Sequence, residues 1–371
     1  MFHFRFPLAL LAACGLCAAH AAPLTPAQAT QAARLLASDN PADLASAAKG
    51  FRSQGESVRA AYQPLLEKAE TVHKERLKAK IGVALPVLQK FGESQKEWAA
   101  ARDACLVLLY QKTGHEARKL ADLARSYATA EKAMKDLARH LKNPPAGLTT
   151  WQSSAAALNT INAELAWCRD TPERDQDYFR KVPVADHAKA VPSGAAFLTL
   201  AGPYQERLEA QSAMERAGLF NNKEIRWPAP ALKAFMELIN ARRYVLGLIP
   251  LRLDERLSNA ARDHSKEMQQ LKYFEHESPV EANKTPWDRA KNAAFEGQCM
   301  GENIYMGSAA PEAAFKGWWE SDGHRFIMFQ KDANTLGLGV VGVHWTLNTG
   351  SRDWPETGME EAGGGKSGRP G

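Results

Sequence analysis

Glycine is distributed unevenly along this chain, and the asymmetry limits the folds that the chain can adopt. Of 26 glycines, only ten lie in residues 1–230, and sixteen lie in the last 141. Glycine weakens helix interiors, whereas turns and close backbone approaches need it. The change near residue 230 therefore predicts a helical first part and a second part that contains strands and turns.

Residues 22–228 begin with clear helix-start signals. Thr25-Pro26 and Asn40-Pro41 each place a capping side chain before a proline at the first helical position. We predict an all-α helical region here, an antiparallel bundle that serves as a spacer or docks a partner protein.

Prolines punctuate this helical region. Pro64 and Pro86 are expected to kink or divide the helices that they interrupt. Five more prolines, at 172, 183, 192, 203 and 228, indicate a proline-rich connector at its end.

The first 21 residues have the order of a secretory signal peptide. An early Arg5 precedes an apolar stretch and the small-residue site Ala19-His20-Ala21. Cleavage after Ala21 would give a secreted or periplasmic protein. Residues 11–14 also resemble a bacterial lipobox, so the alternative is a lipoprotein anchored at Cys14. After the first two dozen residues, no apolar run has the length of a membrane-spanning helix.

Three cysteines remain after such cleavage, namely Cys105, Cys168 and Cys299. In an oxidising compartment an odd number allows at most one intramolecular disulfide. The sequence does not choose the pair. No CxxC motif survives, which disfavours a thiol-disulfide oxidoreductase and a cysteine-built zinc module.

Charge and histidine spacing argue against nucleic-acid binding and against a metal site in the helical region. The formal net charge is only +5, and no basic run with interleaved aromatic residues suggests nucleic-acid binding. The histidines of the helical region, His73, His115, His140 and His187, lack metal-ligand spacing, and we expect them to face solvent.

The part after residue 230 contains a second set of capped helices. Asp254 can cap a helix whose apolar face includes His264, which we expect to be a buried, hydrogen-bonded histidine. Thr285-Pro286 starts another helix, with an acid at its third position.

A glycine motif near the end of the chain is misleading. Residues 337–342 fit GxGxxG, but the following residues continue as strand where a dinucleotide site needs a helix. We therefore reject nicotinamide or flavin binding. The apolar phase shifts by one residue near Gly342, and we interpret the shift as a β-bulge.

Several motifs in residues 230–349 resemble the CAP superfamily of cysteine-rich secretory, antigen 5 and pathogenesis-related (SCP-like) proteins, in its bacterial form. The motifs occur in order, with compatible gaps: Leu238-Ile239-Asn240-Ala241-Arg242, Gly247-Leu248-Ile249-Pro250-Leu251, His264, Tyr273-Phe274-Glu275-His276, Thr285-Pro286-Trp287-Asp288-Arg289-Ala290, Gly301-Glu302-Asn303-Ile304 and Gly323-His324-Arg325.

This resemblance implies an α+β fold in residues 229–349, an α-β-α sandwich with a small antiparallel sheet. Residues 350–371 lie outside the resemblance; they contain few apolar groups, and we expect a disordered tail there. The resemblance also implies a cleft lined by His276, Glu302 and His324. The second acid of many eukaryotic members falls on Ser321 here, beside Glu320. Many bacterial relatives have asparagine where this chain has Ile327.

The three cleft residues allow two interpretations. Two imidazoles and a carboxylate suit a divalent metal such as Zn²⁺ in tetrahedral geometry, with a water as the fourth ligand. A metal-free hydrogen-bonded network that fixes the loops is the alternative.

Three functions follow. The first is a non-catalytic extracytoplasmic binding module for a lipid-like or cell-envelope ligand. The second is a metal-assisted hydrolase with Glu302 as base. The third is an assembly or adhesion scaffold. The missing second acid and the absence of HExxH and GxSxG motifs favour the binding module.

Overall fold

The computed structural model describes residues 23–112, 115–223 and 230–354. The predicted signal peptide at 1–21 lies outside these ranges, and so do residues 355–371 of the predicted tail. Gly350 and Ser351, the first residues of that predicted tail, instead belong to the last strand, so the expectation of disorder from residue 350 is wrong for them.

The first two helices begin where their capping residues predict. Helix α1 (Pro26–Ala37) follows Thr25 in a capping box, and α2 (Pro41–Arg52) follows Asn40, whose side chain accepts a hydrogen bond from the Ala42 amide. The predicted all-α region is confirmed by the elements that follow: η2 (Glu56–Val58), α3 (Arg59–Tyr110), α4 (Ala117–Leu141), α5 (Ala146–Cys168), α6 (Glu173–Lys181), α7 (Val184–Lys189) and α8 (Gly194–Lys223).

Helix α3 is longer than the prolines suggest. It continues through Pro64 and Pro86, so neither proline divides it. The chain forms two compact units, residues 1–89 with 143–202 and residues 90–142 with 203–371. Helices α3 and α8 each pass from one unit to the other. The predicted domain boundary at residue 228 stays a prediction.

The first unit has its own core, and one histidine lies inside it. Phe51 of α2 stacks on Tyr62 of α3 with ring centroids 4.1 Å apart. His73 is fully buried, with Nε2 3.0 Å from the Leu35 carbonyl oxygen and Nδ1 3.4 Å from the Asp39 carboxylate. The expectation that His73 faces solvent is wrong, because these two acceptors compensate for its burial.

The C-terminal region contains one four-stranded sheet in the order β1-β3-β4-β2. The strands are β1 (Arg252–Leu253), β2 (Gln298–Met306), β3 (Thr335–Val341) and β4 (His344–Ser351). Strands β2, β3 and β4 pair antiparallel, whereas the two-residue β1 pairs parallel with β3. The sheet is therefore mixed, and the α+β class is confirmed.

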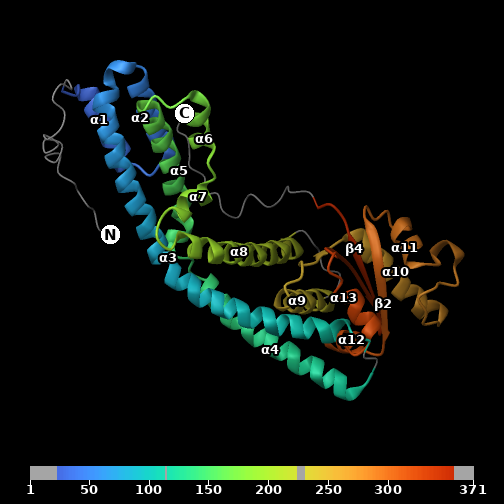
Figure 1. Ribbon diagram of the computed structural model, residues 1–371. Helices are drawn as coiled ribbons and strands as arrows, with labels where there is room; N and C mark the ends of the chain where they lie inside the picture. Colours follow the sequence, from blue (N-terminus) through green and yellow to red (C-terminus); the bar gives the residue numbers. More distant parts are fainter. Residues whose placement is uncertain (1–22, 113–114, 224–229, 355–371) are drawn as a thin grey trace. The chain divides into compact units, whose positions relative to one another are not determined.

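Helices cover both faces of this sheet (Figure 1). On one face, Ser265 of α10 (Glu255–Leu271) lies 2.8 Å from Thr346 of β4, hydroxyl to hydroxyl. On the other face, the ring of Phe235 in α9 (Pro230–Val245) lies 5.8 Å from that of Trp345. Adjacent strand residues point to opposite faces, so the predicted α-β-α sandwich is confirmed. The remaining helices are η3 (Glu281–Asn283), α11 (Pro286–Asn292), α12 (Pro311–Trp319) and α13 (Asp322–Met328).

The glycines of the GxGxxG sequence have a packing role. A Cβ atom at Gly337 would lie 2.5 Å from the Leu257 carbonyl carbon, and one at Gly339 would lie 2.2 Å from the Arg262 nitrogen. These glycines let α10 approach β3 backbone to backbone. Strands β3 and β4 flank a tight turn at Gly342, which has φ +59°. The shift in the apolar pattern is thus caused by a hairpin turn between β3 and β4, and the predicted β-bulge is wrong.

Helices α3 and α4 contact the C-terminal residues within the second unit. Trp98 Nε1 donates to the Val245 carbonyl oxygen at 2.8 Å, and the Tyr110 hydroxyl donates to the Phe329 carbonyl oxygen at 2.7 Å. The Tyr127 ring packs edge-on against Trp319 at 5.9 Å. These contacts tie α3 and α4 to α12, α13 and the end of α9.

All three remaining cysteines, Cys105, Cys168 and Cys299, are free thiols. Burial raises the pKa of each to about 11, so the thiols are protonated at neutral pH. In the part of the chain that the structure describes, no helix combines the length and the apolarity needed to cross a membrane.

Candidate functional site

The three predicted cleft residues come from three different elements. His276 lies in the loop after α10, Glu302 lies in β2, and His324 lies in the first turn of α13. Asp254 caps the start of α10 and Thr285 caps α11 in a capping box, as predicted. The loop that carries His276 leaves α10 at its C-cap Lys272, which has a left-handed backbone, and ends at Thr285.

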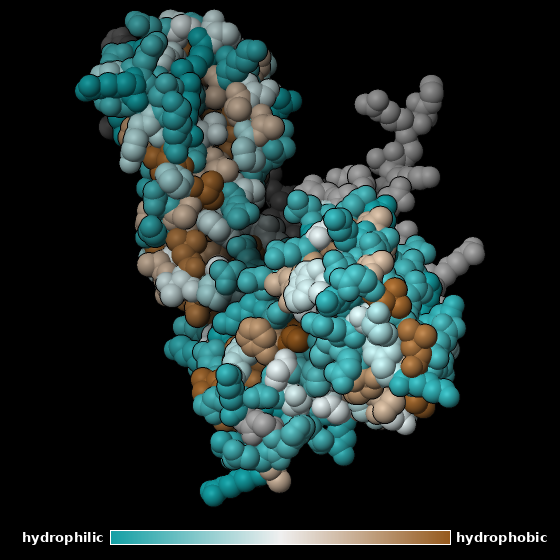
Figure 2. Space-filling view, turned by 90° about the vertical axis from the view of Figure 1, so that its right-hand side faces the viewer, coloured by the Kyte–Doolittle hydropathy of each residue, from teal (hydrophilic) through white to brown (hydrophobic). Residues whose placement is uncertain are grey.

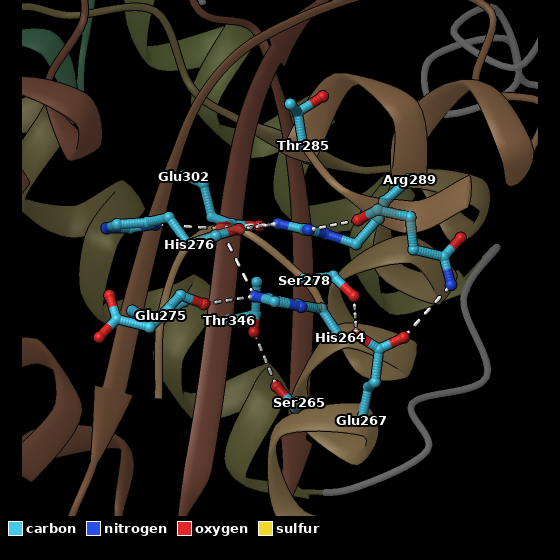
Figure 3. Close-up of polar contacts among 12 residues, drawn as sticks. His264, Ser265, Glu267, Glu275, His276, Ser278, Thr285, Arg289, Glu302 and Thr346 are labelled. Carbon is cyan, nitrogen blue, oxygen red and sulfur yellow. Dashed lines mark hydrogen bonds and ion pairs between the residues drawn. The ribbon is translucent and has the colours of Figure 1, made fainter. Parts of the chain in front are cut away.

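Glu302 is the centre of the site, and its carboxylate is almost entirely enclosed. His276 Nδ1 lies 3.1 Å from Glu302 Oε1. Arg289 of α11 donates from one terminal nitrogen to both carboxylate oxygens, at 2.9 and 2.7 Å. The side chains of Glu302 and Arg289 are only 1% and 3% exposed, whereas His276 is 49% exposed. Figure 3 shows His276 on one side of this carboxylate and Arg289 on the other.

Arg289 also holds the loop that carries His276. It donates to the carbonyl oxygens of His276, at 3.0 Å, Asn283, at 2.8 Å, and Lys284, at 3.2 Å. A buried guanidinium with this many acceptors fixes both the loop backbone and the carboxylate.

His264 lies beneath the cleft and has the buried, hydrogen-bonded role expected for it. Its Nε2 is 3.2 Å from the Glu275 carbonyl oxygen and 3.8 Å from Glu302 Oε1, and its Nδ1 is 3.3 Å from the Tyr273 hydroxyl. Burial lowers the pKa of His264, and the nearby Glu302 opposes this effect. The imidazole is therefore neutral at neutral pH.

Glu267 extends this network away from Glu302. Tyr273, Ser278 and Asn283 all donate hydrogen bonds to its carboxylate. Figure 3 shows the bond from Ser278. Burial alone would raise the pKa of Glu267, but these hydrogen bonds hold it below its ordinary value, so the group is ionised.

Among the described residues, the His324 side chain makes no hydrogen bond to Glu302, and its link to the site is an electrostatic interaction with His276. Burial lowers the pKa of His324, and the nearby imidazoles of His276 and His115 lower it further. The Asn303 amide donates to the His324 carbonyl oxygen at 3.0 Å, which positions its backbone. Its Nδ1 is buried and has no partner in the described chain.

The two departures from the family pattern are accommodated locally. Ser321 occupies the cap position of α13, where its side chain makes no capping bond. The Ile327 side chain fills the space above Gly301, since a Cβ atom there would lie 3.1 Å from it.

The donor set does not fit a three-ligand metal site in this geometry. Arg289 donates to both oxygens of Glu302 and places a positive charge beside them, and this charge disfavours a cation at the carboxylate. In the described ranges, no group of three His, Cys, Asp or Glu side chains could hold a metal ion. We derive no chemistry through a metal.

Sequence reasoning did not assign a role to Arg289, although the residue belongs to the motif at 285–290. A usable signal was its place on the inward side of a short capped helix next to buried Ala290. Buried arginines are commonly paired with an acid, and Glu302 is the acid in the neighbouring motif.

Residues 236–344 match the family described as the Cysteine-rich secretory protein family, CAP. Together with the sandwich and the site around Glu302, this match makes the C-terminal region of the chain a CAP domain.

Two relatives and one solved structure resemble this region. The uncharacterized protein YkwD of Bacillus subtilis (strain 168) is 34% identical over 155 residues, which are 37% of this chain and 60% of that protein. The uncharacterized membrane protein YlbC of the same strain is 33% identical over 116 residues, which are 31% of this chain and 33% of that protein. The chain therefore spans less than two thirds of the length of either relative.

The solved structure is an extracellular protein containing a SCP domain from Bacillus anthracis str. Ames. It shares 32% identity, over 32% of this chain and 40% of that chain, with a TM-score of 0.31.

Proposed function

We propose that this protein is an exported, non-catalytic binding module whose CAP cleft takes a lipid-like ligand of the cell envelope. The observation that carries the proposal is the state of Glu302, which is 1% exposed and held by Arg289 through both of its oxygens. The sequence pattern of residues 1–21 supports export.

A general base must reach the proton that it removes and must have a free lone pair. The Glu302 carboxylate is buried and already accepts three hydrogen bonds, so it is poorly placed to activate a water molecule. Its contact with His276 Nδ1 instead orients the imidazole and leaves Nε2 for a ligand. This arrangement favours binding over the metal-assisted hydrolase.

The groups near the cleft suit an amphiphile. His276 is half exposed, so its Nε2 can form a hydrogen bond with a polar head group. Phe274 and Phe326, each two residues from one of these histidines, are 38% and 54% exposed. Figure 2 shows a largely polar surface with scattered apolar residues.

Lipid binding by the mature chain tests the proposal. The probe is a soluble short-chain phosphatidylglycerol, followed by titration calorimetry. We expect saturable binding that weakens about tenfold or more in His276→Ala and in Phe274→Ser. The control is Val83→Ser, which removes an exposed apolar side chain from α3.

Two results would overturn this function. One is lipid binding that is equally strong in the wild type, His276→Ala and Phe274→Ser. The other is stoichiometric Zn²⁺ uptake by the wild type together with ester or amide hydrolysis that Glu302→Gln abolishes, which would establish the hydrolase.

A further inference from the structure

A polar cavity lies behind Glu302, on the side away from His276. It has a volume of about 320 Å³ and opens between α10 and α11. Figure 3 shows the two sides, with His276 on one side of the Glu302 carboxylate and Arg289 and Glu267 on the other. Its polar walls are formed by Asn259, Asp263, Glu267, Asn283, Arg289 and Asn292. The volume is at the lower end of the range for small-molecule sites.

Arg289 has hydrogen-bonding capacity that the protein leaves unused. Its two terminal nitrogens donate to Glu302 and to three carbonyl oxygens, but its Nε is buried and has no acceptor in the described chain. An unsatisfied buried donor costs about 1–3 kcal/mol, so native proteins supply it with a partner, a ligand or a water molecule. Arg289 lines the cavity, but its Nε is enclosed by protein atoms, so the groups that a ligand can reach are those of the other wall residues.

A second wall residue is also unengaged. The side chain of Asn259 on α10 is half-buried and makes no hydrogen bond to any residue in the described ranges. An asparagine amide can donate and accept at once. Glu267, across the same cavity, is ionised and accepts hydrogen bonds. The walls therefore present donors and acceptors side by side.

The charges of the lining balance. Arg262 and Arg289 contribute two positive charges, and Asp263 and Glu267 contribute two negative ones. A charged ligand of either sign would be repelled by the two wall residues that carry the same charge. A neutral molecule with several adjacent hydroxyl groups matches the lining, because each hydroxyl both donates and accepts. Ala260 and Ala293 add small apolar surfaces against which the C–H groups of a ring can pack.

We propose that this cavity binds one unit of a neutral saccharide, with sugar hydroxyls bonded to Asn259 and Glu267. The site is separate from the cleft of His276 and His324, and it does not depend on the lipid-binding function proposed above.

The test uses the mature full chain, with glucose and N-acetylglucosamine as probes, in saturation-transfer NMR titrations. We expect saturable binding of at least one sugar. Asn259→Ala should weaken it about tenfold, the effect of one lost hydrogen bond of about 1.4 kcal/mol. Ala293→Leu should abolish it, because the larger side chain fills the cavity. Circular dichroism and thermal unfolding establish that each variant is folded.

Two controls separate this cavity from the rest of the surface. Asn143→Ala removes an exposed asparagine that does not line the cavity, and it should leave sugar binding unchanged. His276→Ala should also leave it unchanged, even where lipid binding is lost. Absence of sugar binding by the wild type would show that the cavity holds water only and would overturn the proposal. So would binding that His276→Ala removes and Ala293→Leu retains.

Discussion

Replacing Arg289 with methionine tests whether the buried pair with Glu302 holds the cleft together. Methionine keeps much of the volume of the arginine stem and removes the charge. The variant leaves the Glu302 carboxylate, 1% exposed, without its cation, and it also removes the donors to three loop carbonyls. Loss of one partner of a buried ion pair costs about 3–5 kcal/mol.

Hydrogen exchange of the β3 and β4 amides, read by mass spectrometry, measures this cost locally. These central strands exchange when the domain opens, so a loss of 3–5 kcal/mol accelerates their exchange about a hundredfold to a few thousandfold. The matched control is Arg256→Met, which breaks an arginine–glutamate pair of 2.5 Å with Glu296 on the exposed surface. Its effect should be far smaller, because solvent screens exposed pairs.

A double variant sharpens the test. Arg289→Met with Glu302→Gln removes both charges, so it should recover part of the lost protection. If Arg289→Met exchanges no faster than Arg256→Met, the buried pair contributes little and the reasoning about Glu302 fails.

Four further predictions follow from the structure. Gly339→Ala should destabilise the CAP domain by about 3 kcal/mol, because its Cβ would lie 2.2 Å from the Arg262 nitrogen, whereas Gly323→Ala, with open space around it, should be nearly neutral; thermal unfolding compares them. Burial lowers the pKa of His264 below its ordinary 6.5, so the unfolded chain binds that proton more readily and the free energy of unfolding should fall as the pH drops below about 6.5; a thermal midpoint in His264→Gln as acid-sensitive as in the wild type would contradict this. Residues 229–349 should fold alone but unfold at a lower temperature than in the full chain, since Trp98 and Tyr110 no longer bond them, and a fragment without a cooperative transition would refute the boundary. The intact mass of the exported protein should correspond to a chain that begins at Ala22, and a diacylglycerol-bearing species that begins at Cys14 would establish the lipoprotein alternative.

Local signals predicted the elements well because their causes are local. Thr25, Asn40, Asp254 and Thr285 cap helices through bonds to amides two or three residues away, so the sequence alone locates these helix starts. His264 lies on the apolar stripe of its helix, and it is buried as that stripe indicates.

The same local reasoning failed where neighbours distant in sequence decide the outcome. His73 is buried because Leu35 and Asp39, on another part of the chain, supply its partners. The apolar phase shift near Gly342 did not distinguish a bulge from a hairpin turn, since both shift the phase by one residue.

The sequence by itself determined the helical first part, the CAP-like motifs of the second part and the identity of His276, Glu302 and His324 as the polar residues of those motifs. Only the tertiary structure decided what Glu302 can do. Glu302 lies 26 residues from His276 and 13 from Arg289 in the sequence, and these separations do not predict that the side chains meet. They meet because α11 and β2 pack together. That packing encloses the carboxylate with a guanidinium, and the enclosure turns a candidate base or metal ligand into a buried acceptor that positions an imidazole.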